Sequence, residues 1–179
     1  MPHPLHDIAI GADPPDVLNA FIEIPRGSRN KYELHKETGF LKLDRLLYSA
    51  VHYPGDYGFI PQTLGDDGDA LDILVLTTEP TFPGCIVEVR PVGVFMMEDE
   101  KGDDEKILAV PLADPMRQEV FELSDLPAHL LEEIRHFFTV YKDLEGKRVH
   151  TTGWEGKERA RQVVLDCVER YRAHLAAAD

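Results

Sequence analysis

The chain has 179 residues, a hydrophobic fraction of 43% and a formal net charge of −14. This length and composition predict one globular domain with a sizeable core and argue against disorder. So acidic a surface would repel nucleic acids and anionic membranes. Apolar runs are too short to span a bilayer, and residues 1–7 lack the features of a signal peptide. Cys85 and Cys167 are too few for a disulfide framework, so we expect a reducing, cytoplasmic setting.

Short apolar runs separated by glycine and proline dominate the first two-thirds of the chain. Runs of this kind predict strands, and Gly39 between two of them predicts a hairpin turn. Residues 49–64 contain prolines and glycines, Gly55 and Gly58 among them, and predict an ordered but irregular loop. The predicted strands cover residues 17–24, 31–37, 40–47, 71–77, 85–97 and 106–110.

The last third of the chain has helical periodicity. Residues 130–141 and 160–175 place apolar side chains at helical spacing, and Pro127 suits a helix start. Strands followed by helices predict an α+β fold, with helices packed on a closed or sandwiched sheet. We therefore expect a single domain over residues 1–179, with an N-terminal segment at 1–16, a mainly β part at 17–112 and a mainly helical part at 113–179.

The most informative stretch is an acidic run at the start of the predicted buried strand 71–77. Four carboxylates lie within seven residues, at Asp66, Asp67, Asp69 and Asp72. Crowded like charges need a cation, and Asp72 alone would be costly to bury. An extended backbone would direct Asp67 and Asp69 to one side, and carboxylate oxygens suit Mg²⁺ or Mn²⁺. A solvated acidic turn is the alternative, whereas an EF-hand loop is excluded by the spacing.

A second group of acids lies in the tip of the predicted hairpin formed by residues 85–97 and 106–110. Asp99, Asp103 and Asp104 are followed there by Lys106. Such a tip is usually solvated, but the lysine could contact an anion that metal ions also hold. This mixture makes the tip a candidate second part of the site.

Further cations and phenols lie near the ends of predicted elements. Strand alternation places Lys31 and Glu33 on one side of their strand. Lysine, arginine and tyrosine are side chains that bind phosphate oxygens. Each residue alone has a structural explanation, but together they fit a phosphate site built from metal ions and side chains. The set comprises Lys31, Arg45, Tyr53, Tyr57, Tyr141 and Lys142.

Several other chemistries find no support in the sequence. The glycine patterns of P-loop and Rossmann phosphate sites do not occur. The histidines are scattered, the two cysteines lack the spacing of metal ligands, and no serine has the context of a nucleophile elbow. We therefore expect no covalent nucleophile.

These residues together resemble the family I soluble inorganic pyrophosphatases. The family signature D-G-D-P-x-D is similar to Asp67-Gly68-Asp69-Ala70-Leu71-Asp72, with alanine in place of proline. The resemblance covers residues 21–154, with the motifs in the expected order. The other matching segments are Phe21–Pro25, Lys31–Glu33, Asp44-Arg45, Tyr53–Gly58, Arg90–Gly93, Asp99–Pro111 and His136–Glu145.

The resemblance implies a fold and a set of roles. The fold would be a five-stranded, OB-like closed β-barrel with two main helices packed outside. Asp67, Asp72 and Asp104 would surround one metal ion, and Asp72 would be shared with a second. Asp99 and Asp104 would serve a metal ion carried by the substrate, with Glu23 nearby. Asp69 would be the general base, with Tyr57 near it and Tyr53 in support. Lys31, Glu33, Arg45, Lys106, Tyr141 and Lys142 would bind the substrate.

The hypothesis is magnesium-dependent hydrolysis of pyrophosphate to two phosphates, with other divalent cations as substitutes. Metal ions would lower the pKa of a water, Asp69 would accept its proton, and attack would be in line without a covalent intermediate. Two alternatives stay open: a two-metal phosphohydrolase for nucleotides or sugar phosphates, and a non-enzymatic acidic binding module.

The resemblance also implies a homohexamer, with the helix around His136 near a subunit contact. Three positions depart from the family pattern, at Asp56, Ala70 and Val140. The sequence does not show what the first of these changes. Val140 replaces a histidine and affects the expected contact between subunits more than the chemistry.

Overall fold

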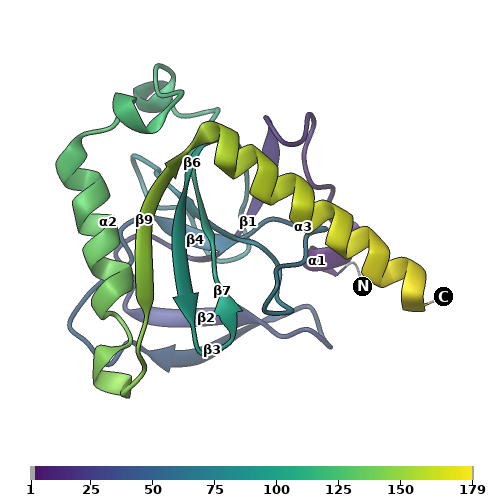
Figure 1. The fold of residues 1–179 in the computed structure, drawn as a ribbon, viewed down its shortest axis with the longest axis horizontal. Coiled ribbons are helices and arrows are strands. Elements are labelled where there is room, and N and C mark those ends of the chain that lie inside the picture. The colour runs from purple at the N-terminus through teal and green to yellow at the C-terminus, as the bar shows by residue number, and fades with distance from the viewer. Residues whose placement is uncertain (1–2, 179) are drawn as a thin grey trace.

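The computed structural model describes residues 3–178 and has the mixed α+β fold that the sequence predicted (Figure 1). Residues 1, 2 and 179 lie outside the described part, so the predicted N-terminal segment is described from His3 onward. The strands are β1 Leu18–Ile24, β2 Asn30–Leu34, β3 Leu41–Leu46, β4 Asp56–Phe59, β5 Asp72–Val75, β6 Ile86–Asp99, β7 Gly102–Asp103, β8 Lys106–Pro111 and β9 His150–Gly156. The helices are α1 Pro4–Asp7, α2 Ala128–Val140 and α3 Lys157–Ala178, with 3-10 turns at Pro115–Arg117, Leu123–Asp125 and Asp143–Glu145.

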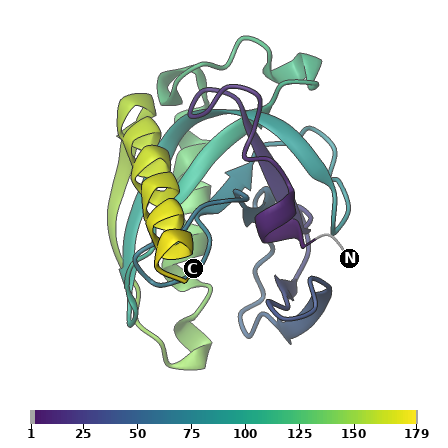
Figure 2. The ribbon, with the colours of Figure 1, turned by 90° about the vertical axis from the view of Figure 1, so that its right-hand side faces the viewer.

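Five strands form a ring in the order β1, β4, β5, β8 and β6. The ring closes because β6 also pairs with β1. The β5–β8 pair is parallel and the other neighbours are antiparallel. A register shift between Pro91 and Gly93 lets the long strand β6 bend. The hairpin β2–β3 is a separate two-stranded sheet, which lies below α1 in Figure 2.

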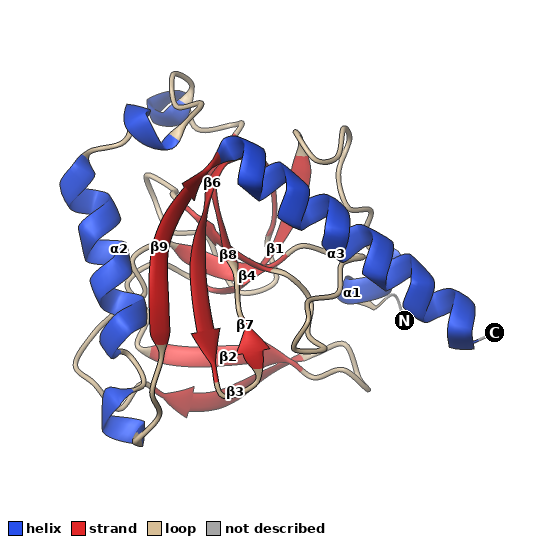
Figure 3. Ribbon diagram, in the orientation of Figure 1, coloured by secondary structure: helices blue, strands red, loops and turns tan. Residues whose placement is uncertain are grey.

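The two long helices cover different surfaces of the strands, and Figure 3 shows both helices outside them. Along β5, Ile73 and Val75 join the apolar cluster under α3, whereas Leu74 joins the cluster under α2. Strands covered on both faces are apolar at every position. This explains the continuous apolar run that predicted a buried strand here. Among the described residues, no helix is both long and apolar enough to cross a membrane.

Strand β4 corrects the prediction of an irregular loop at residues 49–64. Gly58 lies in β4, where its backbone pairs with β1. A Cβ at Gly58 would lie 1.9 Å from the Phe21 carbonyl oxygen, so this glycine permits close strand packing and does not mark a turn. Strand β9, which pairs with β6, is a further strand that the helical pattern of the last third did not reveal.

Asp56, one of the departures from the family pattern, is fully buried at the start of β4. Its carboxylate accepts hydrogen bonds from the Arg26 backbone N–H at 2.7 Å and from Thr81 N–H and Oγ1–H at 2.9 and 2.6 Å. A buried carboxylate is tolerated when donors surround it in this way. Asp56 therefore joins the end of β1 to the segment between β5 and β6.

We predict that Gly58→Ala lowers the free energy of unfolding by about 2 kcal/mol or more, because the new methyl group must displace backbone. Urea unfolding followed by circular dichroism measures this. Gly156→Ala is the matched control, since a Cβ at Gly156 meets no atom within 4 Å. Equal stability of the two variants would contradict the prediction.

Candidate active site

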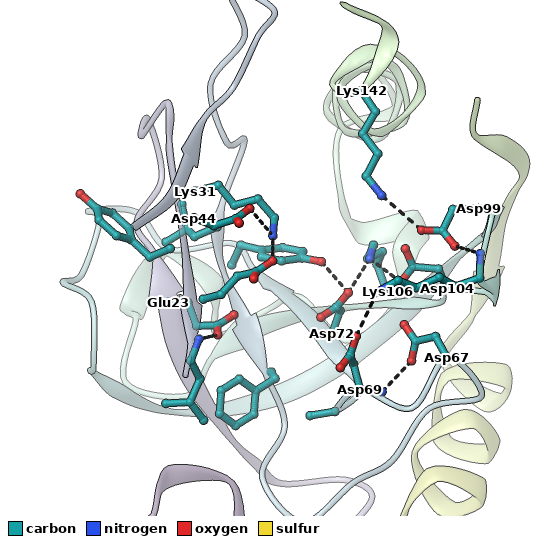
Figure 4. A pocket seen from close by; sticks show the side chains of 18 of the residues that line it. Glu23, Lys31, Asp44, Asp67, Asp69, Asp72, Asp99, Asp104, Lys106 and Lys142 are labelled. Carbon is teal, nitrogen blue, oxygen red and sulfur yellow. Dashed lines mark hydrogen bonds and ion pairs between the residues drawn. The ribbon is translucent and has the colours of Figure 1, made fainter. Parts of the chain in front are cut away.

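One cavity of about 430 Å³ collects the predicted site residues (Figure 4). The hairpin β2–β3 forms one side of it, and the strand ends of β4, β5 and β8 form the floor. The tip of β6–β7 and the residues after α2 form the other side. All of the predicted site residues except Tyr53 contribute to the lining: Glu23, Lys31, Glu33, Arg45, Tyr57, Asp67, Asp69, Asp72, Asp99, Asp104, Lys106, Tyr141 and Lys142.

Lys106 lies at the centre of the floor. Its ammonium donates to Asp72 Oδ2 at 2.5 Å and to Asp104 Oδ1 at 2.6 Å. The parallel register of β5 and β8 pairs Asp72 with Lys106, so the strand pairing itself brings the two charges together. Tyr57 in β4 donates its hydroxyl to the same Asp72 oxygen at 2.6 Å.

Lys106, Asp72 and Asp104 influence one another's charge through their close contacts. Burial disfavours the ammonium form of Lys106, but Asp72 and Asp104 outweigh it and hold the pKa of this lysine well above its ordinary value. Burial raises the pKa of Asp72, Lys106 opposes that rise, and Asp104 adds to it. The two carboxylates therefore depend on the positive charge between them.

Glu23 on β1 is a second buried carboxylate of the cavity, with 9% of the residue exposed. It accepts a hydrogen bond from the Leu34 backbone N–H at 2.7 Å. Burial raises its pKa to about 8, and the hydrogen bond from Leu34 only partly offsets this. A nearby cation would strongly stabilise the ionised form of this buried carboxylate.

Asp67 and Asp69 lie in a turn, which corrects the expectation that an extended backbone directs them to one side. Gly68 between them has φ +83°, and the Asp69 N–H donates to Asp67 Oδ1 at 3.0 Å. Burial raises the pKa of Asp67, although that hydrogen bond opposes it. Both residues nevertheless line the cavity.

Asp99 and Lys142 join the tip of β6–β7 to the segment after α2. Lys142 Nζ donates to Asp99 Oδ2 at 3.2 Å, and the Lys101 N–H donates to Asp99 Oδ1 at 2.8 Å. Burial works against the charged form of Asp99, but these two donors lower its pKa. The Lys142 ammonium also lies 5.3 Å from the centre of the buried Tyr141 ring.

The hairpin cations are already paired with carboxylates. Lys31 contacts Glu33, which confirms that the two side chains share one side of the strand, and lies 3.5 Å from Asp44. Arg45 contacts Asp44 and meets Glu145 Oε1 at 2.5 Å. Burial opposes ionisation of Asp44, yet Lys31 and Arg45 lower its pKa.

Tyr53 is the predicted site residue that does not line the cavity. Only 2% of it is exposed, and its ring packs against Tyr57 and Phe137 at 5.3 and 4.9 Å between centroids. Tyr53 therefore packs behind Tyr57, in the position of a supporting residue rather than on the surface of the cavity.

The donor set suits a hard divalent cation. Oxygen ligands at these positions are those that Mg²⁺ prefers. In the described part of the chain, no three acidic, imidazole or thiol side chains are positioned as a preformed metal site. Instead, the Lys106 ammonium lies between two of the predicted ligands, Asp72 and Asp104, which shows that this position attracts positive charge.

The sequence analysis did not identify Lys36 and Lys101 as lining residues of the cavity. They pair with Asp69 at 2.5 and 3.7 Å. Glu145, which is not among the lining residues, pairs with Arg45. Lys101 lies in the charged tip 98–105, which gave a weak signal for it. Lys36 carries no motif, because its proximity to Asp69 arises only when the hairpin folds against the acidic turn.

The comparisons with known proteins agree with one another. The family model for inorganic pyrophosphatase matches residues 20–172. The inorganic pyrophosphatase of Geobacillus stearothermophilus is 52% identical over 155 residues, which are 87% of this chain and 94% of that protein. The inorganic pyrophosphatase of Methanosarcina acetivorans is 54% identical over 155 residues, with coverages of 87% and 92%.

Comparison with solved structures points to the same family. The crystal structure of inorganic pyrophosphatase from Thermus thermophilus superposes with a TM-score of 0.91 at 47% identity, covering 94% of this chain and 99% of that one. The resemblance inferred from the motifs is thereby confirmed over most of the sequence. The chain belongs to the inorganic pyrophosphatase family.

Proposed function

We propose that this chain hydrolyses inorganic pyrophosphate to two phosphates with the help of bound magnesium ions, which manganese could replace. One observation carries the proposal: carboxylates suited to metal ions and lysines suited to phosphate oxygens line the same cavity. Membership of the inorganic pyrophosphatase family supports the choice of substrate.

Each part of the cavity has a role in this proposal. Asp67, Asp72 and Asp104 hold metal ions, with Asp99 and Glu23 at the edges of the same group. When bound, such ions acidify the attacking water and offset the charge of the phosphates. The substrate side is formed by Lys31, Glu33, Arg45, Lys106, Tyr141 and Lys142.

The residues of the chain supply positioning and proton transfer. Asp69 accepts the proton of the attacking water, and Tyr57 orients Asp72 through their hydrogen bond. Lysine and arginine side chains offset the charge of the reacting and departing phosphates. Attack by water forms no covalent bond to the protein.

We also propose a cytoplasmic homohexamer built from OB-like barrels. Closure of the strand ring by β1 and β6 supports the barrel. Large apolar side chains are exposed on the hairpin, with Phe40 59% and Leu43 54% exposed, and α2 exposes His136. The thiols of Cys85 and Cys167 are free, which suits a reducing compartment.

The decisive test is phosphate release by the purified protein. We expect release from pyrophosphate with Mg²⁺, loss of activity with excess chelator and recovery when Mg²⁺ is restored. Nucleoside triphosphates and sugar phosphates should react much more slowly. Preference for one of these would favour the broader class of two-metal phosphohydrolases, and no release from any substrate would favour a binding module.

Asp69→Asn should lower kcat by about a hundredfold or more, because the variant cannot accept the proton of the attacking water. The KM for pyrophosphate and the affinity for Mg²⁺ should change little, as steady-state kinetics and calorimetry would show. Asp66→Asn is the matched control, since Asp66 pairs with Arg170 at 3.0 Å on the other side of the same turn. Near-normal turnover of the Asp69 variant would exclude Asp69 as the base.

Affinity for Mg²⁺ should rise between pH 6 and pH 9. The pKa of Glu23 in the metal-free protein is raised to about 8, so Glu23 is protonated at pH 6 and ionised at pH 9. A cation binds the ionised form, and protons compete by up to roughly a hundredfold two pH units below that pKa. Titration calorimetry at both pH values measures the difference. Glu23→Gln should reduce it, and an unchanged pH dependence in that variant would contradict the role of Glu23.

A further inference from the structure

The N-terminal helix α1 ties the hairpin β2–β3 to the rest of the chain. Figure 1 shows α1 between the turn of this hairpin and α3, and Figure 2 shows α1 above the hairpin. On the α3 side, His6 Nδ1 and the Tyr171 hydroxyl lie 2.7 Å apart. The loop after β4 is joined through Gln62, whose N–H donates to the Leu5 carbonyl at 2.9 Å.

His3, at the start of α1, holds the backbone of Lys36. The Leu5 N–H donates to His3 Nδ1 at 3.3 Å, so this nitrogen is the acceptor of the ring. The other nitrogen, Nε2, therefore carries the proton and donates to the Lys36 carbonyl at 2.8 Å. Asp7 fixes His3 further by accepting its backbone N–H at 2.5 Å.

Lys36 in turn extends to the acidic turn of the cavity. Its ammonium lies 2.5 Å from Asp69 Oδ1 and 3.5 Å from the Gly68 carbonyl oxygen. Within residues 3–178, the other ion pair of Asp69 is the longer one to Lys101, at 3.7 Å. Of the two lysines paired with Asp69 among these residues, Lys36 is therefore the nearer.

We propose that Lys36 is a positioning residue for Asp69, and that the N-terminal segment His3–Asp7 holds Lys36 in place. The inference rests on the proposed role of Asp69 as the base. His3–Asp7 lies outside residues 20–172, which match the family model, so the family match does not cover this arrangement.

The contact affects catalysis rather than stability. The side chains of Lys36 and Asp69 are 63% and 43% exposed, and an ion pair this exposed adds little to folding. Proton transfer is different, because misplacement of a base by about 1 Å can cost a large factor in rate. Loss of Lys36 should therefore appear in turnover and not in thermal stability.

The test compares single variants at saturating Mg²⁺. Lys36→Met should lower kcat roughly tenfold with unchanged KM and unchanged melting temperature. Lys36→Arg should restore most of the turnover, because it keeps the charge. Lys42→Met is the matched control: it removes a lysine from the same hairpin, and Lys42 has no ion pair among the residues described. Its turnover should equal that of the unmodified protein.

A double-mutant cycle isolates the link to Asp69. In the Asp69→Asn background, Lys36→Met should lower kcat no further. His3→Ala should lower kcat roughly threefold in the unmodified protein and have no further effect in the Lys36→Met background.

The results also separate this inference from the proposed function. If Asp69→Asn is slow but Lys36→Met has normal kcat, the inference is overturned and the function stands. If Lys36→Met raises KM and leaves kcat unchanged, Lys36 is a substrate ligand and the inference is overturned. If Lys36→Met lowers kcat by the same factor in the Asp69→Asn background as in the unmodified protein, Lys36 acts independently of Asp69, and the inference is again overturned. Normal turnover of Asp69→Asn would overturn it together with the assignment of the base.

Discussion

The cavity depends on a buried positive charge between two negative ones. Lys106 is 2% exposed, and its ammonium lies between Asp72 and Asp104. None of these groups could be buried alone without a large cost in solvation. The parallel pairing of β5 with β8 brings Lys106 to Asp72, so the topology of the sheet determines the charge arrangement of the site. The same surplus of carboxylate makes the cavity suitable for metal ions.

The fold isolates these polar groups by covering the strands on both faces. The cluster under α2 includes Tyr57, Leu74 and Phe138, whereas the cluster under α3 includes Ile73 and Val164. Polar residues lie at the strand ends, where they line the cavity. The separate hairpin β2–β3 then forms one side of the cavity and adds its own cations. Core and site are thus built from consecutive residues of the same strands.

Much of the candidate site could be predicted from the sequence, because metal and phosphate chemistry requires particular residue types in a recognisable order. The run from Asp67 to Asp72 predicted metal ligands, and the structure places Asp67, Asp69 and Asp72 in the lining of one cavity. The contacts between distant segments were harder to predict from the sequence. Closure of the ring depends on residues 18–21 pairing with residues 86–89, a contact between distant segments that no local pattern encodes. Gly58 indicated a loop because a glycine needed for close strand packing has the same sequence signal as one in a turn. Lys36 escaped notice because it lies 33 residues from Asp69 and belongs to no motif.

Strand β6 connects several parts of the fold. It has 14 residues and pairs with β1, β7, β8 and β9. Its ends thus serve different partners: the first residues close the ring, and the last ones carry Asp99 into the cavity. A fragment lacking this strand would leave β7 and β9 without the strand that they pair with and would open the ring between β1 and β8, so the sheet that supports the cavity could not close.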